Sequence, residues 1–378
     1  MSKITNIGYD AKRIVSNATG LGSYARTLLL SLSEERERNF FLYAPSEGRK
    51  ELYNQITKKN NIVFRHPKHG NTLSKWIWRE RTVVNDLLRD NIGLFHGLSG
   101  QLPCGIRQSG IKSVVTIHDL IFMRHPEWYS FFDVQIYKKK FYRSVREADK
   151  IIAISECTKR DILSLSDTEE EKIEVIYQSY NPVFTDRISE EEKQRIKKKY
   201  SLPERFILNV GTVERRKNVL LAVKALCELK NEHLVIVGRH TEYAQEVKRF
   251  IKENNLSDRV HLLGGVLFEE LKVLYSLAEV FVYPSVYEGF GIPVIEAIAN
   301  SLPVIACTGS CLEEAGGGDS LYVNPDDTRA MREALKVFLY DKEKRASAVA
   351  ESLKYIKKFE NNDVASKHLR LYDSLYGN

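Results

Sequence analysis

The sequence has few cysteines and no long apolar segment, and these absences exclude several classes of protein. Five scattered cysteines among 378 residues match neither a disulfide framework nor a zinc site built from cysteine pairs, so we expect reduced thiols. No apolar run approaches the roughly 18 residues of a membrane span. The first residues also lack the apolar stretch of a signal peptide. Together these absences predict a cytoplasmic protein.

The composition is that of a folded, soluble chain. Hydrophobic residues make up 43% of the sequence and charged residues 28%, which excludes disorder and collagen-like structure for most of its length. Because domains usually contain about 100 to 200 residues, the length predicts two domains.

The positive charge is concentrated in the first half of the chain. Residues 1–150 contain 25 Lys and Arg against 14 Asp and Glu, whereas the remainder contains 32 against 36. Such asymmetry indicates that one domain faces an anionic partner: a membrane surface, a nucleic acid or a phosphorylated substrate. A solvated charged surface explains the excess equally well.

Short apolar runs alternate with amphipathic, helix-like stretches throughout the chain. They are rich in β-branched and aromatic residues, as buried parallel strands are, and the alternation predicts βαβ units in both halves. The expected strands are Ile4–Tyr9, Phe40–Tyr43, Ile62–Phe64, Ile92–His96, Ser113–His118, Ile151–Ser155, Ile173–Tyr177, Phe206–Val210, Leu234–Val237, Val260–Leu263, Val280–Tyr283, Val304–Ala306 and Leu321–Val323.

The domain boundary is expected near residue 182. A Pro-Val-Phe segment there leads into a highly charged, helix-prone stretch before a new strand begins. We therefore predict a first Rossmann-like domain over residues 1–181 and a second over 182–360. A helix is expected over 361–378, with its return to the first domain as one alternative. Ligands of doubly wound sheets bind at the carboxyl ends of the strands, so two facing domains predict an interdomain cleft.

The segment from Val280 to Asn300 carries the most informative motif, VFVYPSVYEGFGIPVIEAIAN. Gly289 and Gly291 let backbone N–H groups approach a ligand, and Pro293 suits the first turn of a helix. Two acids flank this loop, Glu288 and, in what we expect to be the first helical turn, Glu296. Carboxylates at these places can accept hydrogen bonds from sugar or ribose hydroxyls.

This pattern resembles a known enzyme family. Glu288, Gly289, Phe290, Gly291, Pro293 and Glu296 are similar to the E-x7-E signature of retaining glycosyltransferases of family 4, which have the GT-B fold. The resemblance extends over nearly the whole chain. It implies that Glu288 lies near the donor sugar, that the amides of residues 289–291 bind sugar hydroxyls, and that Glu296 holds the ribose.

A basic pair follows the first strand of the second half, in the segment NVGTVERRKN. Arg216 and Lys217 can neutralise a diphosphate leaving group without a metal ion. Alone, such a pair is usually surface charge, but similarity to the family's Arg-Lys pair implies phosphate binding. The family often has an arginine where this sequence has Thr212, whose hydroxyl can still donate a hydrogen bond.

Two further segments at the ends of strands are candidate contacts. His118, in TIHDL, follows a buried strand and matches a family His-Asp pair, which implies a contact to the sugar or a phosphate; Asp119 orients the imidazole or caps the next turn. Gly20 and Gly22, in ATGLGSY, lack the spacing of a dinucleotide fingerprint. The family's glycine loop implies that they approach the donor phosphate and the acceptor, whereas a plain helix start is the alternative.

Several other features have mainly structural interpretations. Asp327 is expected to cap a helix, His96 suits a structural role as well as an acceptor contact, and no metal site is predicted. Trp76 and Trp78, interleaved with Lys75, Arg79 and Arg81, form a candidate membrane anchor. One helical face cannot present both tryptophans, so we expect at least one of them in the core.

The sequence therefore predicts a metal-independent retaining hexosyltransferase of the GT-B class, without a cofactor. Its co-substrate would be a nucleotide sugar, with GDP-mannose as the first choice and a UDP-hexose as the second, since VYEGFG and GTVERRKN look most like mannosyltransferase segments. The acceptor would be a glycan or a lipid-linked precursor, with peripheral contact at the inner face of an anionic membrane as a hypothesis.

Two alternatives remain open. One is a sugar-nucleotide epimerase or phosphorylase on the same architecture. The other is a non-catalytic protein that binds a nucleotide sugar or a nucleic acid, although no nucleic-acid-binding motif is evident and we expect no such partner.

Overall fold

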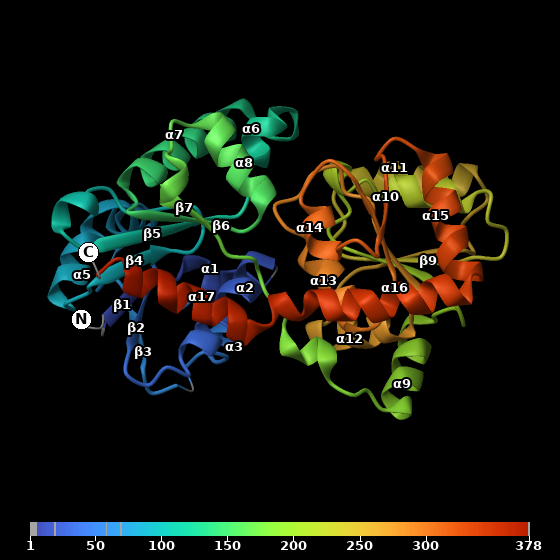
Figure 1. Ribbon diagram of the computed structural model, residues 1–378, viewed down its shortest axis with the longest axis horizontal. Helices are drawn as coiled ribbons and strands as arrows, with labels where there is room; N and C mark the ends of the chain where they lie inside the picture. The colour runs from blue at the N-terminus through green and yellow to red at the C-terminus, as the bar shows by residue number, and fades with distance from the viewer. Residues whose placement is uncertain (1–5, 19, 58, 69, 377–378) are drawn as a thin grey trace. The chain divides into compact units, whose positions relative to one another are not determined.

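The computed structural model describes residues 6–18, 20–57, 59–68 and 70–376 (Figure 1). The chain divides into two compact units, the first formed by residues 1–181 with 359–378 and the second by residues 182–358. Each unit contains one sheet with helices on both of its faces (Figure 1).

The first unit contains a seven-stranded sheet in the order β3-β2-β1-β4-β5-β6-β7, and every neighbouring pair is parallel. Its strands are β1 (Asn6–Asp10), β2 (Asn39–Tyr43), β3 (Ile62–Arg65), β4 (Leu94–Gly97), β5 (Lys112–Ile117), β6 (Lys150–Ala153) and β7 (Ile173–Val175). Its α-helices are α1 (Lys12–Ser16), α2 (Gly20–Leu32), α3 (Lys50–Tyr53), α4 (Thr72–Ile77), α5 (Val83–Arg89), α6 (Ile121–Arg124), α7 (Phe131–Glu147), α8 (Glu156–Leu165) and α17 (Asn361–Ser374). A π-helical turn, Trp78–Thr82, connects α4 to α5.

The second unit contains a six-stranded parallel sheet in the order β10-β9-β8-β11-β12-β13. Its strands are β8 (Ile207–Val210), β9 (Leu234–Val237), β10 (Val260–Leu263), β11 (Val280–Tyr283), β12 (Val304–Cys307) and β13 (Leu321–Val323). Its α-helices are α9 (Glu190–Tyr200), α10 (Val219–Leu226), α11 (Tyr243–Glu253), α12 (Phe268–Leu277), α13 (Ile292–Ala299), α14 (Leu312–Gly316), α15 (Thr328–Tyr340) and α16 (Lys342–Tyr355).

The apolar runs form the buried centre of each sheet. All residues of β4, β8, β9, β11 and β12 are buried, as expected for parallel strands covered on both faces. Each run that we expected to be a strand contains one, with ends displaced by no more than three residues; Ile4 and Thr5 lie outside the described residues. The prediction of two Rossmann-like parallel sheets is therefore confirmed.

Each sheet reverses its strand order once. The reversal lies at β1 and β4 in the first unit and at β8 and β11 in the second. At such a point the connections leave the two neighbouring strands in opposite directions, which opens a crevice beyond their carboxyl ends where ligands of α/β sheets bind. The fold thus indicates where to look for a site in each unit.

The last helix, α17, packs against α2 within the first unit (Figure 1). The buried His368 ring lies 3.4 Å from the Tyr24 hydroxyl, measured from Nε2 to Oη. The carboxylate of Asp373 accepts two hydrogen bonds from the buried guanidinium of Arg38, at 2.7 and 2.8 Å. The end of the chain is therefore an integral part of the first unit.

Candidate functional site

Most of the residues predicted to bind a donor lie at the strand reversal of the second unit. One loop, residues 211–218, follows β8, and the other, residues 284–291, follows the neighbouring strand β11. Hydrogen bonds join the two loops: the amide of Val286 donates to the carbonyl of Arg216 at 2.9 Å, and the Arg216 guanidinium donates to the carbonyl of Tyr287 at 2.8 Å. Two sequence motifs about 70 positions apart thus form one local structure.

Glu288 bridges the two cations of this site. Its carboxylate lies 2.5 Å from Lys217 Nζ and 2.8 Å from the guanidinium of Arg216, and the residue is only 8% exposed. Burial alone would raise the pKa of Glu288, but the charges of Lys217 and Arg216 lower it to about 2. The carboxylate is therefore ionised at neutral pH and holds both cations in place.

Two residues that sequence reasoning missed complete this charge cluster. Lys217 Nζ donates to the hydroxyl of Tyr283 at 2.5 Å and lies 4.8 Å from the centre of its ring. Glu214 lies 2.8 Å from the Arg216 guanidinium. Tyr283 is the last residue of β11, directly before the loop over residues 284–291, so its position at a strand end was the available signal.

The thiol of Cys311 contacts the backbone of the glycine loop. Cys311 is fully buried, and its Sγ lies 3.1 Å from the carbonyl oxygen of Glu288 and 2.9 Å from that of Phe290. Gly291 has a φ of +120°, and a Cβ there would lie 2.9 Å from the side chain of Leu312, so glycine is required. The side chain of Phe290 is buried in the core. The binding of sugar hydroxyls by the amides of residues 289–291 stays a prediction.

Glu296 occupies a second buried position in this unit. It is 8% exposed, and its carboxylate accepts a hydrogen bond from Tyr275 Oη at 3.1 Å. Burial raises the pKa of Glu296 to about 7, although the bond from Tyr275 opposes the shift. Our expectation of a place in the first helical turn was wrong, because α13 begins at Ile292 and Glu296 is its fifth residue. Pro293 does lie in that first turn, as predicted.

The loop after β8 leaves one hydroxyl available. Gly211 has a φ of +155°. Its carbonyl oxygen lies so close to Gly238 that a Cβ on Gly238 would clash with it. Thr212 follows, half-buried, and its side chain makes no hydrogen bond to any residue in the described part of the chain. Its role as a phosphate contact stays a prediction that the geometry permits.

His118 lies at the carboxyl end of β5 in the first unit, with both ring nitrogens engaged. Nε2 donates to the carbonyl of Leu98 at 2.7 Å, which leaves Nδ1 as the acceptor of a 3.0 Å bond from the Gln178 amide. Burial lowers the pKa of His118 to about 4, so the ring is neutral. A contact from His118 to a sugar stays a prediction, and it requires the exchange of one of these partners. Asp119 caps the next turn by accepting from the Ile121 amide.

Gly20 and Gly22 differ in their surroundings. A Cβ on Gly22 would overlap the carbonyl oxygens of Arg13 and Asn17, so this glycine lets α2 pack against α1. A Cβ on Gly20 would meet no atom within 4 Å. The packing of α2 therefore explains Gly22, whereas nothing in the packing requires Gly20.

The structure decides the other sequence-based interpretations. His96 is buried and bonded to Tyr372 and Thr116, a structural role. Asp327 caps α15 as predicted, by accepting from the Ala330 amide at 2.8 Å. Trp78 is buried and Trp76 is 53% exposed, which confirms that one tryptophan belongs to the core. The five cysteines are free thiols.

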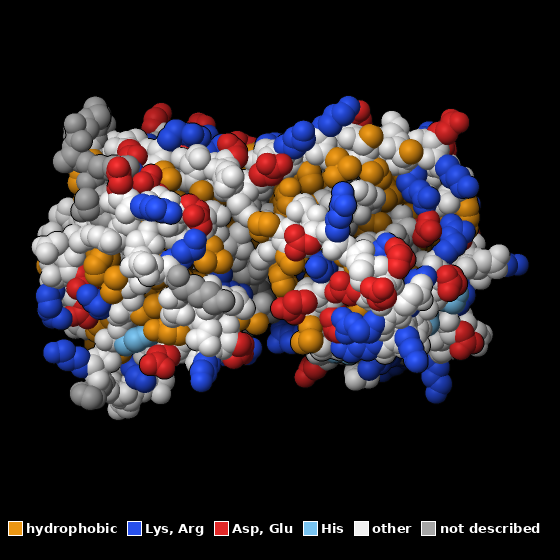
Figure 2. Space-filling view, turned by 90° about the horizontal axis from the view of Figure 1, so that it is seen from below, with side chains coloured by type: hydrophobic (Ala, Val, Ile, Leu, Met, Phe, Trp, Pro, Cys, Tyr) orange, Lys and Arg blue, Asp and Glu red, His pale blue; other side chains and the backbone are white. Residues whose placement is uncertain are grey.

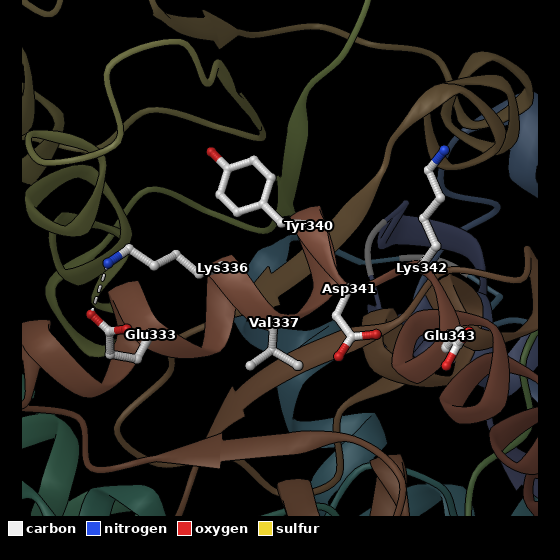
Figure 3. A pocket seen from close by; sticks show the side chains of 7 residues that line it. All are labelled: Glu333, Lys336, Val337, Tyr340, Asp341, Lys342 and Glu343. Atoms are coloured by element: carbon white, nitrogen blue, oxygen red, sulfur yellow. Dashed lines mark hydrogen bonds and ion pairs between the residues drawn. The ribbon is translucent and has the colours of Figure 1, made fainter.

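A surface hollow of about 730 Å³ lies elsewhere in the second unit, along α15 and the start of α16 (Figure 3). The lining side chains are mostly charged, and two of them, Glu333 and Lys336, bond to each other at 3.1 Å (Figure 3). None of the site residues predicted from the sequence lines this hollow. We therefore assign it no function.

Among the residues that the structure describes, no three His, Cys, Asp or Glu side chains are grouped to hold a metal ion. Within the same ranges, no helix combines the length and the apolar character that crossing a membrane requires.

Two family models match the chain, one in each half. The model described as Glycosyltransferase Family 4 matches residues 18–184, and that described as Glycosyl transferases group 1 matches residues 190–354. Among curated proteins, the O-antigen chain mannosyltransferase RfbU of Salmonella typhimurium is 34% identical over 60% of each chain. The O-antigen chain mannosyltransferase B of Escherichia coli is 27% identical over 75% of this chain and 74% of its own. The chain thus spans less than two thirds of RfbU.

Solved structures share the fold at low sequence identity. A glycosyltransferase from Rickettsia africae has a TM-score of 0.78 with 18% identity, and the match covers both chains completely. Anabaena Alr3699/HepE, solved in complex with UDP and glucose, has a TM-score of 0.75 with 14% identity over 98% of this chain and all of its own. These likenesses confirm the GT-B expectation for the fold.

Proposed function

The chain belongs to the glycosyltransferases of group 1 and family 4, and from that premise we propose that it transfers a mannosyl residue from a nucleotide sugar to a hydroxyl of a glycan or glycolipid precursor. GDP-mannose is the first candidate donor and a UDP-hexose the second. The mannosyltransferase relatives RfbU and O-antigen chain mannosyltransferase B support the sugar. The UDP complex of HepE supports a nucleotide sugar and keeps the UDP-hexose under consideration.

The cluster of Arg216, Lys217 and Glu288 carries this proposal. Two partly buried cations at a strand reversal are held by one ionised carboxylate, which leaves them preorganised for a diphosphate. As the diphosphate binds, its oxygens accept N–H bonds from Lys217 and Arg216. The cations then stabilise the negative charge that grows on the leaving group.

We propose the remaining roles from the family resemblance. The amides of the loop over residues 289–291 hold the sugar hydroxyls, and Glu296 accepts bonds from the ribose hydroxyls. The bond from the anomeric carbon to the phosphate oxygen breaks while the bond to the acceptor oxygen forms on the same face. The acceptor proton passes to the leaving phosphate, so the reaction needs no nucleophile from the protein. His118 contacts the sugar after exchanging a partner.

The proposal includes a lipid-linked acceptor and peripheral contact with an anionic membrane. Phe131 and Phe132, at the start of α7, are 71% and 77% exposed, and Trp76 on α4 is 53% exposed. Lys139 on α7 is exposed as well. Exposed aromatic residues beside lysines are typical of surfaces that dock on anionic lipids. Absence of binding to anionic vesicles at low salt would contradict this part.

A thermal-shift panel tests the donor. GDP, UDP and their sugars are compared on the wild type and on Lys217→Ala, because a ligand at 100 times its dissociation constant stabilises the folded state by about 2.7 kcal/mol. We expect stabilisation by GDP and GDP-mannose that Lys217→Ala largely loses. Stabilisation by UDP and UDP-hexoses alone would show that the donor is a UDP-hexose and not GDP-mannose. No stabilisation by any nucleotide would contradict the proposed function.

A further inference from the structure

Two cations directly after β1 have no partner in the part of the chain that the structure describes. Lys12 and Arg13 follow Asp10, the last residue of β1, and both are exposed. Neither side chain makes a hydrogen bond or an ion pair to a described residue. They lie at the carboxyl end of the strand where the sheet order reverses, which is where a parallel sheet receives its ligand.

A built network of charged groups lies beside them. The carboxylate of Asp10, 6% exposed, forms a two-bond ion pair with Arg79 and accepts a bond from the Lys12 amide at 3.2 Å. Arg79 also donates to the side-chain oxygen of Gln101 at 3.0 Å. Lys140, on α7, donates to the same oxygen at 3.3 Å. Gln101 follows β4, the other strand at the reversal. The network therefore fixes two cations, Arg79 and Lys140, beside the segment that carries Lys12 and Arg13.

Cations are crowded in this network beyond what its acids balance. Partial desolvation and the charges of Arg79 and Arg13 lower the pKa of Lys12, and Lys140 adds to the shift, whereas Asp10 opposes it. Glu80 is occupied by ion pairs with Lys140 and Arg143. A bound anion would relieve this repulsion, because it would place negative charge where the protein has too little.

Basic side chains do not cover the molecular surface uniformly. On the face seen in Figure 2, lysine and arginine side chains are interspersed with acidic ones. The charge of Arg13 also contributes to lowering the pKa of the His118 ring. A candidate sugar contact and the unpaired cations thus occur in the same part of the first unit.

We propose that Lys12 and Arg13, supported by Arg79 and Lys140, form an anion-binding site at the carboxyl ends of β1 and β4 that takes a phosphate or diphosphate group of the acceptor. This inference rests on the proposed glycosyl transfer, and it assigns a chemical class to the acceptor. Arg13 offers a planar fork and Lys12 a mobile point charge, a combination suited to phosphate oxygens. Arg79 and Lys140 contribute through their fields, since their own donors are engaged.

Isothermal titration with pyrophosphate tests the site in the intact protein. The titration is made with the donor site saturated by the nucleotide selected in the thermal-shift panel, so that Arg216 and Lys217 are occupied. The double variant Lys12→Gln/Arg13→Gln should bind pyrophosphate at least about tenfold more weakly than the wild type, since a hydrogen bond to a charged group contributes about 1.5 kcal/mol or more. Its nucleotide affinity should be unchanged.

A matched control removes the same number of positive charges at the amino ends of the strands, away from the proposed site. Arg36 precedes β2 and Lys112 begins β5, so Arg36→Gln/Lys112→Gln should bind pyrophosphate like the wild type. If both double variants lost the same affinity for pyrophosphate, binding would depend only on the net charge of the protein, which would overturn the inference. Unchanged pyrophosphate binding in Lys12→Gln/Arg13→Gln would also overturn it. A loss of nucleotide affinity in that variant would show that Lys12 and Arg13 bind the donor and not the acceptor, which would also overturn the inference.

Nucleotide binding separates this inference from the proposed function. If the wild type binds no nucleotide, the proposed function fails, and with it the acceptor role of the site. If the wild type binds a nucleotide and the pyrophosphate affinities do not differ between the variants, only the present inference fails.

Discussion

Lys217 and Glu288 are 71 positions apart in the sequence, yet their charged atoms lie 2.5 Å apart. The pair joins the loop after β8 to the loop after β11, at the strand reversal of the second unit. Because both side chains are largely buried, neither charge is easily screened by solvent. This one contact couples the group expected to bind a diphosphate to the group expected near the sugar.

Glu288→Gln should separate binding from turnover. The Glu288 carboxylate competes with the donor diphosphate for Lys217 and Arg216. The neutral amide of the variant does not compete in this way, so KM for the donor should stay the same or fall. The cations lose their fixed positions, and kcat should fall by about two orders of magnitude or more. Steady-state kinetics of nucleotide release provide both values.

Glu246→Gln is the matched control for this change. Glu246 pairs at 2.6 Å with Arg215, which neighbours Arg216 in the same loop, but both side chains are exposed. Exposed pairs contribute little, so this variant should retain wild-type kinetics. If Glu288→Gln also retained them, Glu288 would have no part in the reaction.

Nucleotide binding should release a proton near neutral pH. Burial holds the pKa of Glu296 at about 7, whereas bonds from ribose hydroxyls favour the ionised carboxylate. Titration calorimetry at pH 7 in buffers of different ionisation enthalpy measures the proton. The wild type should release a fraction of one proton per nucleotide, and Glu296→Gln should release none. Equal proton counts in both proteins would rule Glu296 out as the ribose ligand.

The same carboxyl should make the free protein less stable as the pH rises. Its pKa is higher in the folded chain than in the unfolded chain, so between about pH 4.5 and 7 the folded state binds more protons and the free energy of unfolding falls with pH. The total effect is about 3 kcal/mol. At pH 8, Glu296→Gln should therefore unfold at a higher temperature than the wild type. Thermal melts of both proteins from pH 4.5 to 8 measure how this difference in melting temperature changes with pH.

The two glycines of α2 should respond differently to alanine. Gly22→Ala would overlap the carbonyls of Arg13 and Asn17 and should destabilise the first unit by about 1–3 kcal/mol. Gly20→Ala meets open space and should leave the melting temperature nearly unchanged. A fall in turnover for Gly20→Ala would then indicate a ligand contact, as the family resemblance implies. Chemical denaturation and kinetics of the two variants make the comparison.

The strands could be predicted from the sequence because each is buried on both faces. Such a strand is a short apolar run rich in β-branched residues, as Leu234–Val237 shows, and its ends follow from the polar residues beside it. The short helix Lys12–Ser16 was not foreseen. Five residues are too few to show a helical period.

The site could be predicted only where its residues form local motifs. Lys217 and Glu288 were found because each lies in a recognisable segment after a strand. Tyr283 and Cys311 were not assigned to the site, since their roles depend on contacts that only the folded sheet creates. The ion pair of Asp10 with Arg79 was missed for the same reason: 69 positions separate the two residues, and no local pattern connects them.

Donor turnover by Lys217→Ala, compared with Arg215→Ala, tests the central claim most directly. Both variants remove a cation from the 3₁₀ turn Arg215–Lys217, but Lys217 is buried against Glu288 and Arg215 is exposed. With the nucleotide sugar selected by the thermal-shift panel, nucleotide release should fall by about 10²–10³-fold in Lys217→Ala and stay near the wild-type rate in Arg215→Ala. Equal rates in the two variants would contradict the account.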